Sequence, residues 1–352
     1  MTNFWRGRRV LVTGHTGFKG AWLCLWLGRL GAKVSALALP PATDPSLYQI
    51  AGPWPGQDHC IVDLRDAAAT AAALEAASPE IVFHLAAQSL VRAAYRDPLD
   101  TYATNLMGTL NLLDAVRRTP GVRVVIVATT DKVYENLESG RPFTENDRIG
   151  SGDPYSNSKA CVELAVTAFR SAFFAGRGSA AIACARAGNV LGGGDWAAER
   201  LVPDLVRAAK AKRKVRLRYS DSIRPWQHVL DPLRGYLMLA ERLATHTAGC
   251  PLVLNFGPTA AATLSVAQLA ERFDAAFGAG TGWEREPGDH PEEARTLVLD
   301  SSLARRSLGW RPRLDADATI VWTAAWYRYW RDGGSMRPFS LDQIARFEAL
   351  DS

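Results

Sequence analysis

Short apolar runs alternate with helix-forming segments through the first half of the chain. The run from Val122 to Val127 is rich in β-branched residues, which is typical of a strand buried on both faces of a sheet. Strands that alternate with helices favour a parallel sheet covered on both sides, so we predict an α/β, Rossmann-like doubly wound parallel sheet. The predicted strands are Arg9 to Thr13, Lys33 to Leu39, Cys60 to Asp63, Ile81 to Leu85, Val122 to Val127 and Ala181 to Ala185.

The regular alternation stops after Ala185. A helix over 201–209, a strand near 215–219 and closing helices predict a smaller C-terminal α/β lobe. We therefore expect residues 1–185, with parts of about 222–250, to form one domain, and 186–352 mainly to form the second. Trp322, Trp326 and Trp330 are spaced four apart, which favours core packing or a subunit contact over a cofactor site.

Composition describes an ordinary globular protein, with 47% apolar and 22% charged residues. A formal net charge of +5 suits an anionic small molecule at least as well as nucleic acid. The basic run from Lys210 to Arg218 is read as a solvated face, and it is the only feature that would support nucleic-acid binding. No apolar run has membrane-spanning length, and the N-terminus leads directly into a strand rather than a signal peptide.

The five cysteines lie far apart and, like the six histidines, form no metal-binding spacing. We expect no metal site. Because the cysteines lie mostly within apolar stretches, we predict reduced core residues of a cytoplasmic protein.

A glycine-rich loop follows the first strand and leads into a helix, which is the context that a dinucleotide site requires. Gly14 permits the turn, Gly17 lets backbone approach a pyrophosphate, and Gly20 lets the helix pack on the strand. The second strand ends without an acidic residue for the ribose or an arginine for a 2′-phosphate, so NAD is weakly favoured over NADP. The predicted cofactor-binding loop is Gly14, His15, Thr16, Gly17, Phe18, Lys19 and Gly20.

Further cofactor contacts are expected at the ends of the next strands. Asp63, beside Leu64, is either a partner for the adenine amine or the N-cap of the following helix. Asn105 lies among apolar neighbours and needs partners, which bracing the sheet would supply. Small side chains after the fourth strand let the backbone approach the cofactor. The expected contacts there are Leu85, Ala86, Ala87 and Gln88.

The most informative stretch follows the strand that ends near Val127. Tyr155 and Lys159 are four residues apart, so they share one face of a helix. An ammonium beside a phenol favours phenolate and lowers the phenol pKa, so Tyr155 could take a proton from a substrate hydroxyl. Thr130 could donate a hydrogen bond to the same phenol or hydroxyl. The alternative is a partly buried tyrosine beside a lysine with no chemical role.

These motifs together resemble the extended short-chain dehydrogenase/reductase family over nearly the whole chain. The glycine loop and the Tyr155/Lys159 pair identify only the superfamily. The triplet Thr130, Asp131 and Lys132 is more specific, since related dTDP-glucose dehydratases have Glu at the third position and epimerases usually lack the acid/base pair. Further matching segments are 79–88, 153–159, 187–196, 222–230, 255–258 and 290–294.

The resemblance implies a hydro-lyase that uses NAD to convert CDP-glucose into a 4-keto-6-deoxy sugar nucleotide for surface glycans such as lipopolysaccharide O-antigen. Tyr155 is then the base at the 4-hydroxyl and also a contact of the cofactor. Lys159 lowers the pKa of Tyr155 and holds the nicotinamide ribose, and Thr130 shares the hydrogen bond. Asp131 protonates the leaving 6-hydroxyl. Lys132 is either the base at C5 or a cation that stabilises the enolate.

The resemblance also implies a homodimer or homotetramer, with no nucleic acid and no membrane as partners. The first domain would then bind NAD and the second lobe the nucleotide sugar. The expected substrate-binding residues are Gln88, Asn189, Arg200, Leu201, Arg218, Arg224, His228 and His290.

Two alternatives stay open. One is a dehydratase or epimerase that acts on another nucleotide sugar. The other is a catalytically idle NAD-binding protein, which would have no need for Thr130, Asp131, Lys132, Tyr155 and Lys159 together.

Overall fold

The computed structural model describes residues 2–138, 140–176, 178–246, 248–259, 263–288 and 297–350. Its centre is a seven-stranded sheet in the order β11-β6-β5-β4-β1-β2-β3, in which every pairing is parallel. This confirms the predicted α/β fold class. The strands are β1 (Arg9–Thr13), β2 (Lys33–Ala38), β3 (Gln57–Ile61), β4 (Ile81–His84), β5 (Val124–Ala128), β6 (Ala181–Ala187) and β11 (Val253–Phe256).

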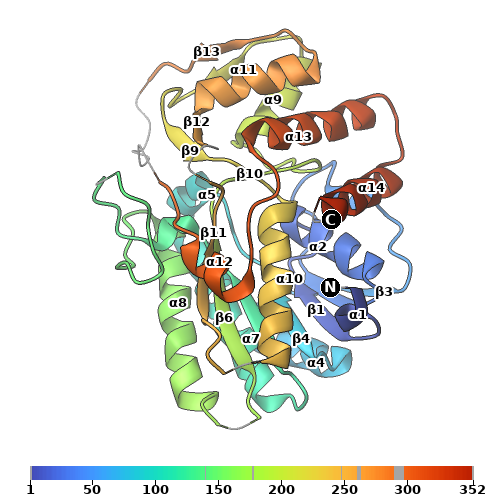
Figure 1. The fold of residues 1–352 in the computed structure, drawn as a ribbon, viewed down its shortest axis with the longest axis vertical. Coiled ribbons are helices and arrows are strands. Elements are labelled where there is room, and N and C mark those ends of the chain that lie inside the picture. Colours follow the sequence, from blue (N-terminus) through green and yellow to red (C-terminus); the bar gives the residue numbers. More distant parts are fainter. Residues whose placement is uncertain are drawn as a thin grey trace.

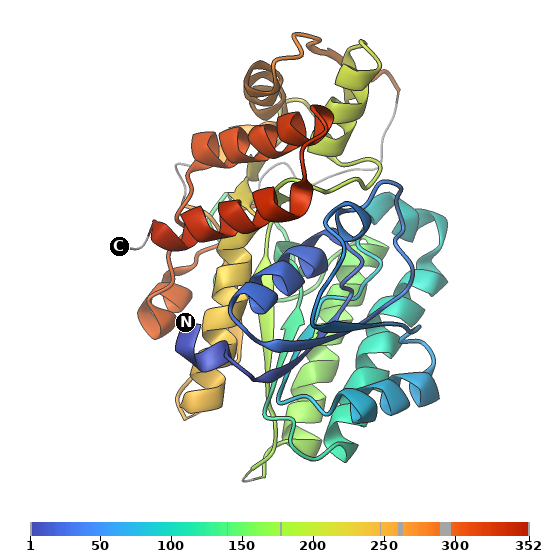
Figure 2. The same cartoon turned by 90° about the vertical axis from the view of Figure 1, so that its right-hand side faces the viewer.

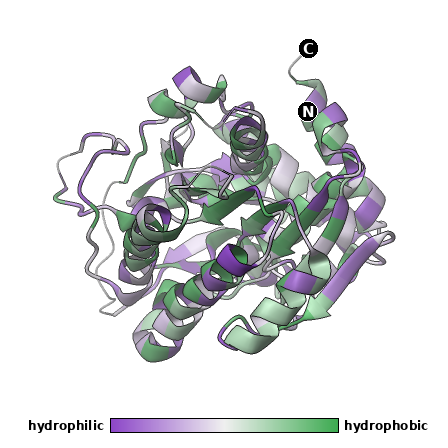
Figure 3. Cartoon of the chain, turned by 90° about the horizontal axis from the view of Figure 1, so that it is seen from below, coloured by the Kyte–Doolittle hydropathy of each residue, from purple (hydrophilic) through white to green (hydrophobic). Residues whose placement is uncertain are grey.

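Alternate side chains of each central strand enter two different cores, because successive residues point to opposite faces of a sheet. Val124 and Ile126 pack with α2 and α10, whereas Val125 and Val127 pack with α4, α7 and α8. Figure 3 shows the apolar strands between these helices. The helices that cover the sheet are α2 (Phe18–Arg29) and α10 (Leu230–Thr245) on one face, and α4 (Ala67–Ala77), α7 (Gly108–Arg118) and α8 (Pro154–Phe173) on the other.

The third strand begins at Gln57 instead of Cys60 and ends at Ile61 instead of Asp63. It is an edge strand with no residue fully buried, so hydrophobicity gives its position weakly. Its Cys60 is exposed, which corrects the expectation of a core cysteine there. Cys24 and Cys184 are buried as predicted, and all five cysteines are free.

Residues after the sixth strand build a smaller group of elements above the sheet (Figure 1). Short strand pairs join β7 to β10, β8 to β13 and β9 to β12. These elements are β7 (Val190–Leu191), α9 (Leu201–Lys210), β8 (Val215–Leu217), β9 (Ile223–Pro225), β10 (Gln227–His228), β12 (Thr263–Ser265), α11 (Val266–Phe277), β13 (Trp283–Arg285) and α13 (Ala316–Arg331). Helix α12 (Ser302–Leu308) lies lower, against β11 and α10 (Figure 1).

The last helix, α14 (Met336–Ala349), returns to the first part of the chain and packs against α2 (Figure 2). The Glu348 carboxylate accepts hydrogen bonds from Trp26 Nε1 at 2.8 Å and from Arg29 Nε at 2.9 Å. On α13, Trp326 is fully buried, which confirms core packing for that part of the tryptophan row. Among the described helices, none combines the length and the apolar character needed to cross a membrane.

The remaining elements are short. They include one π-helical turn, η1, between two α-helices, and one 3-10 turn, η2, after β5. They are α1 (Thr2–Trp5), α3 (Leu47–Ile50), α5 (Val91–Arg96), α6 (Pro98–Tyr102), η1 (Ala103–Met107) and η2 (Asp131–Val133).

Candidate active site

A cavity of about 640 Å³ lies at the carboxyl ends of the parallel strands. This is the place where open α/β sheets bind ligands. It brings together most of the predicted site residues from segments far apart in the sequence. Those that line it are Gly14, Thr16, Gly17, Phe18, Lys19, Gly20, Asp63, Leu64, Leu85, Ala86, Ala87, Thr130, Asp131, Lys132, Tyr155, Lys159, Asn189, Arg200, Leu201, Arg218 and Arg224.

The glycine loop has the geometry that its spacing predicts. Gly14 has φ +78°, and a Cβ there would lie 2.6 Å from the backbone nitrogen of Ala86. A Cβ on Gly20 would overlap the Gly14 carbonyl oxygen, whereas the exposed Gly17 has only that oxygen near it, at 3.4 Å. Gly17 is also the N-cap of α2 and supplies no side-chain cap, so the first-turn amides remain available to an anion. These residues fit the pyrophosphate of a dinucleotide.

Asp63 lies at the cavity wall and is held by its near neighbour Arg65. The Arg65 guanidinium donates to both carboxylate oxygens, with Nη2 2.7 Å from Oδ2, and this bonding lowers the pKa of Asp63. The N-cap of α4 is Asp66, whose Oδ1 accepts from the Ala69 amide at 2.9 Å. The helix-cap alternative for Asp63 is therefore wrong, and its carboxylate remains a candidate for the adenine amine.

Asn105 finds the partners that its buried position demands. Its Oδ1 accepts from the Gln88 amide at 2.8 Å, and its Nδ2 donates to Gln88 O at 3.0 Å and to Ser158 Oγ at 2.8 Å. It lies in the π-helical turn η1, and such widened turns often accompany functional positions. The amide thus fixes the segment after β4 to helix α8, which confirms the predicted bracing.

Thr130, Asp131 and Lys132 form a tight turn immediately after β5. The Thr130 hydroxyl accepts from the Lys132 amide at 3.3 Å and donates to Asp131 Oδ1 at 3.0 Å. Asp131 is buried, and a Cβ on Gly188 would lie 2.7 Å from its Oδ2. A side chain at position 188 would therefore displace this carboxylate.

Tyr155 lies in the first turn of α8, whose start is set by the Asp153 cap and by Pro154. The Thr130 side chain acts to lower the pKa of this phenol, while the Thr130 hydroxyl donates its hydrogen bond to Asp131 Oδ1. Burial raises the pKa of Tyr155 to about 12, against the lowering effects of Thr130 and Arg200. The sequence predicted the opposite direction. The correction follows from desolvation, which disfavours phenolate more strongly than the nearby cations favour it.

Two lysines face the cavity from opposite sides. Burial lowers the pKa of Lys159 to about 8, and its Nζ donates to Ala128 O at 3.2 Å. Burial, with the charge of Arg200, also lowers the pKa of Lys19 to about 8. Both amines thus carry less positive charge than ordinary lysines near pH 8, which weakens the effect of Lys159 on the phenol.

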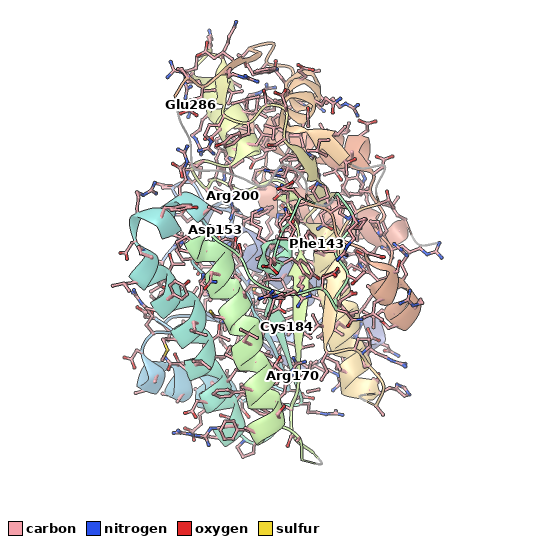
Figure 4. The ribbon with its side chains drawn as sticks, turned by 90° about the vertical axis from the view of Figure 1, so that its left-hand side faces the viewer. Phe143, Asp153, Arg170, Cys184, Arg200 and Glu286 are labelled. Atoms are coloured by element: carbon pink, nitrogen blue, oxygen red, sulfur yellow. The ribbon has the colours of Figure 1, made fainter. Side chains whose placement is uncertain are left out.

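Arg200, labelled in Figure 4, lies at the wall of the cavity and bridges two other residues that line it. Its Nη1 donates to Asp195 Oδ2 at 2.9 Å and its Nη2 to Ser89 Oγ at 2.9 Å. Ser89 and Asp195 were not predicted as site residues, although both line the cavity. Asp195 could have been found as a nearby acidic partner for the predicted Arg200, because it lies only five positions earlier in the sequence.

Four predicted residues do not line the cavity. The Gln88 amide donates to Thr101 Oγ1 at 2.9 Å, and Asn105 is buried behind the same segment. The His15 ring contacts His59, at 4.6 Å between centroids. The fourth of these residues is His228.

His228 is fully buried between Trp22 and Trp322. His290 lies outside the described residues. Within the described part of the chain, no group of three or more His, Cys, Asp or Glu is placed to hold a metal ion.

The chain is similar to known proteins over nearly its whole length. Residues 10–254 match the model of the "NAD dependent epimerase/dehydratase family". The chain is 42% identical over 349 residues to CDP-glucose 4,6-dehydratase of Salmonella typhimurium, with 98% of this chain and 97% of the relative covered.

Two solved structures share the fold. One is an epimerase from Methanothermobacter thermautotrophicus, with TM-score 0.83, 22% identity, and 94% of this chain and 95% of that chain covered. The other is UDP-glucose 4-epimerase of Thermus thermophilus in complex with NAD, with TM-score 0.77, 25% identity, and 91% and 99% covered.

Proposed function

The chain belongs to the NAD dependent epimerase/dehydratase family, and on this premise we propose that it is an NAD-dependent CDP-glucose 4,6-dehydratase. The reaction oxidises the glucose at C4, removes water across C5 and C6, and returns a hydride to C6 to give CDP-4-keto-6-deoxyglucose. The observation that carries the proposal is the Asp131–Lys132 turn, which lines the same cavity as Tyr155 and Lys159.

NAD is the cofactor of the family, and the glycine loop has the shape to hold it. When bound, it supplies the acceptor and later the donor of a hydride. The Gly14–Gly20 loop would hold the pyrophosphate on the N-terminus of α2, and Asp63 and Leu64 the adenine. Leu85, Ala86 and Ala87 would approach it through backbone, and Lys159 would hold the nicotinamide ribose.

In the first half-reaction Tyr155 takes the proton of the sugar 4-hydroxyl. Because burial holds the pKa of its phenol near 12, the base form requires added positive charge in the cavity. Thr130 and the charge of Arg200 favour phenolate. The ammonium form of Lys159 would act in the same direction.

The second half-reaction uses the turn after β5. A ketone at C4 acidifies the proton on C5, which Lys132 removes, while Asp131 protonates the departing 6-hydroxyl. Lys132 and Asp131 are adjacent in the turn and both line the cavity. In the alternative role, Lys132 stabilises the enolate as a cation.

The arginines of the second lobe suit a diphosphate, because a planar guanidinium binds two oxygens at once. We assign Arg200, Arg218 and Arg224, with Asn189 and Leu201, to the nucleotide sugar. Residues 186–352 then mainly hold the substrate, and 1–185, with α10, hold NAD. Gln88 and His228 are not kept in this assignment, because neither lines the cavity.

We also propose a homodimer or homotetramer. Exposed apolar side chains gather on neighbouring helices, where Leu99 on α6 is 81% exposed, Leu164 on α8 59% and Met107 on η1 49%. Burying such side chains against a second copy removes apolar area from water. Sedimentation velocity would detect the assembly, and a monomer at micromolar concentration would refute it.

The test of function is incubation with CDP-glucose, dTDP-glucose and UDP-glucose separately, with added NAD. Mass spectrometry reports loss of one water, and alkaline absorbance reports the 4-keto product. We expect water loss from CDP-glucose. Product from another nucleotide alone would refute the CDP assignment, and inversion at C4 without mass change would indicate an epimerase.

A further inference from the structure

A buried ion pair lies directly behind the turn that carries Asp131 and Lys132. The side chains of Glu163 on α8 and Arg186 on β6 are each 4% exposed. Arg186 Nε lies 2.9 and 3.1 Å from the two carboxylate oxygens, and its Nη2 also donates to Oε2. This is a bidentate pair removed from water.

Both ends of the catalytic turn are attached to this pair. The hydroxyl of Thr129, directly before the turn, donates to Glu163 Oε1 at 2.6 Å. Tyr134, directly after it, accepts at its hydroxyl from Arg186 Nη1 at 2.6 Å, and its ring lies 4.7 Å below the same guanidinium. One ion pair therefore fixes the residues on both sides of Thr130–Val133.

The attachments continue into the rest of the molecule. The Tyr134 hydroxyl donates to Asn255 Oδ1 at 2.7 Å, and Asn255 Nδ2 donates to Phe143 O at 3.0 Å. Glu163 also lies one helical turn beyond Lys159, where its charge opposes the lowering of that amine's pKa by burial. The same carboxylate thus acts on the turn and on the helix that carries the Tyr155/Lys159 pair.

A contribution to stability alone does not explain why this position holds a buried ion pair. Taking two charges out of water is costly, and well-packed apolar replacements are often as stable or more so. A clamp that sets the position of two catalytic side chains is a use that apolar residues do not offer, since they make no directional bonds.

We propose that Glu163 and Arg186 are positioning residues that hold the Asp131–Lys132 turn in register with Tyr155 and Lys159. Its catalytic consequence rests on the proposed dehydratase function. With the clamp released, elimination across C5 and C6 slows more than oxidation at C4, because Asp131 and Lys132 both lie in the turn, whereas Tyr155 and Lys159 lie on α8.

The clamp is tested without substrate by amide hydrogen exchange. Thr129→Val and Tyr134→Phe each remove one attachment and leave the ion pair intact, which avoids the unfolding that an unpaired buried charge would cause. Thr323→Val is the control, because Thr323 is also fully buried but bonds only its own helix, at Thr319 O. We expect exchange in residues 129–135 to accelerate about tenfold in the two clamp variants and not in the control.

The catalytic consequence is tested by isotope effects with CDP-glucose deuterated at C4 or at C5. We expect kcat to fall about tenfold with KM nearly unchanged, while the C5 isotope effect on kcat grows and the C4 effect shrinks. Unchanged exchange in both clamp variants, or equal slowing of both steps, would overturn the proposal. If the wild-type protein processes no nucleotide sugar, the proposed function fails, and the exchange experiment still decides the clamp.

Discussion

The cavity has two sides, one formed mainly by backbone and the other mainly by polar side chains. At the carboxyl ends of β1 and β4, the wall is backbone and small side chains, with Gly14 against Ala86 and Gly20 against Gly14. At the carboxyl ends of β5 and β6, it is polar side chains such as Asp131, backed by the Glu163–Arg186 pair. The first side selects by shape, and the second by charge and hydrogen bonding.

The difference predicts how each side fails. An added methyl group damages a wall made of backbone, because no side chain there can move aside. On the other side, volume matters less than the removal of a proton donor, an acceptor or a charge. The two sides should therefore respond to opposite kinds of substitution.

The largest effect is expected from Tyr155→Phe, which keeps the shape and removes only the phenol oxygen. Under the proposed reaction kcat should fall about 10³-fold, within the range for a lost acid/base group, with NAD affinity unchanged. Steady-state kinetics and calorimetric NAD titration check this. Tyr329→Phe, at a ring that is 42% exposed and stacked on Phe339, is the control and should match wild type. A kcat above a tenth of wild type for Tyr155→Phe would remove it as the base.

Breaking the buried pair should cost most in stability. Glu163→Gln leaves Arg186 charged and unpaired, so we expect the free energy of unfolding to fall by about 3–5 kcal/mol in urea titration. The double variant Glu163→Leu with Arg186→Met removes both charges and should lose less than the single one. A double variant less stable than Glu163→Gln would mean that the pair itself stabilises the fold.

On the backbone side, Gly14→Ala separates strain from lack of space. Gly14 and Gly7 share a positive φ, +78° and +75°, but nothing lies within 4 Å of a Cβ on Gly7. Gly7→Ala should cost about 1 kcal/mol, from conformation alone, and Gly14→Ala about 1–3 kcal/mol more. Thermal unfolding and NAD titration measure both. Equal losses would show that the contact with Ala86 is unimportant.

The smallest effect concerns pH and compares Lys19 on one side with Lys159 on the other. Each has a folded pKa of about 8, below the ordinary 10.5, so the unfolded chain binds more protons between these values. Stability relative to each Lys→Met variant should therefore rise with pH from 8 to 10, by about 2 kcal/mol. Urea titrations at the two pH values test the sign, and a falling difference would contradict it.

The sequence predicted local features well because their causes are local. Gly14 and Gly20 are recognisable from spacing, and Val122 to Val127 from composition, so the sheet and the dinucleotide loop followed. The residues that define the second side meet only through the fold. Glu163, Arg186 and Asn255 come from three distant segments, and no motif links them.

The errors have the same origin. His228 is polar and stands in a segment typical of the family, yet it packs between two tryptophans, which sequence does not show. The edge strand β3 was shifted because exposed strands carry a weak hydrophobic signal. The direction of the Tyr155 pKa was wrong because burial, which depends on tertiary packing, outweighs the neighbouring charges.

The contact between α14 and α2 has a consequence for the order of synthesis. Trp26 leaves the ribosome 322 residues before Glu348, the carboxylate to which it bonds. At typical elongation rates this interval is roughly half a minute. During that time the part of α2 that contacts α14 in the finished protein stays uncovered. The dinucleotide loop and α2 are thus made among the first parts of the protein, whereas α14, which packs against α2, is made last.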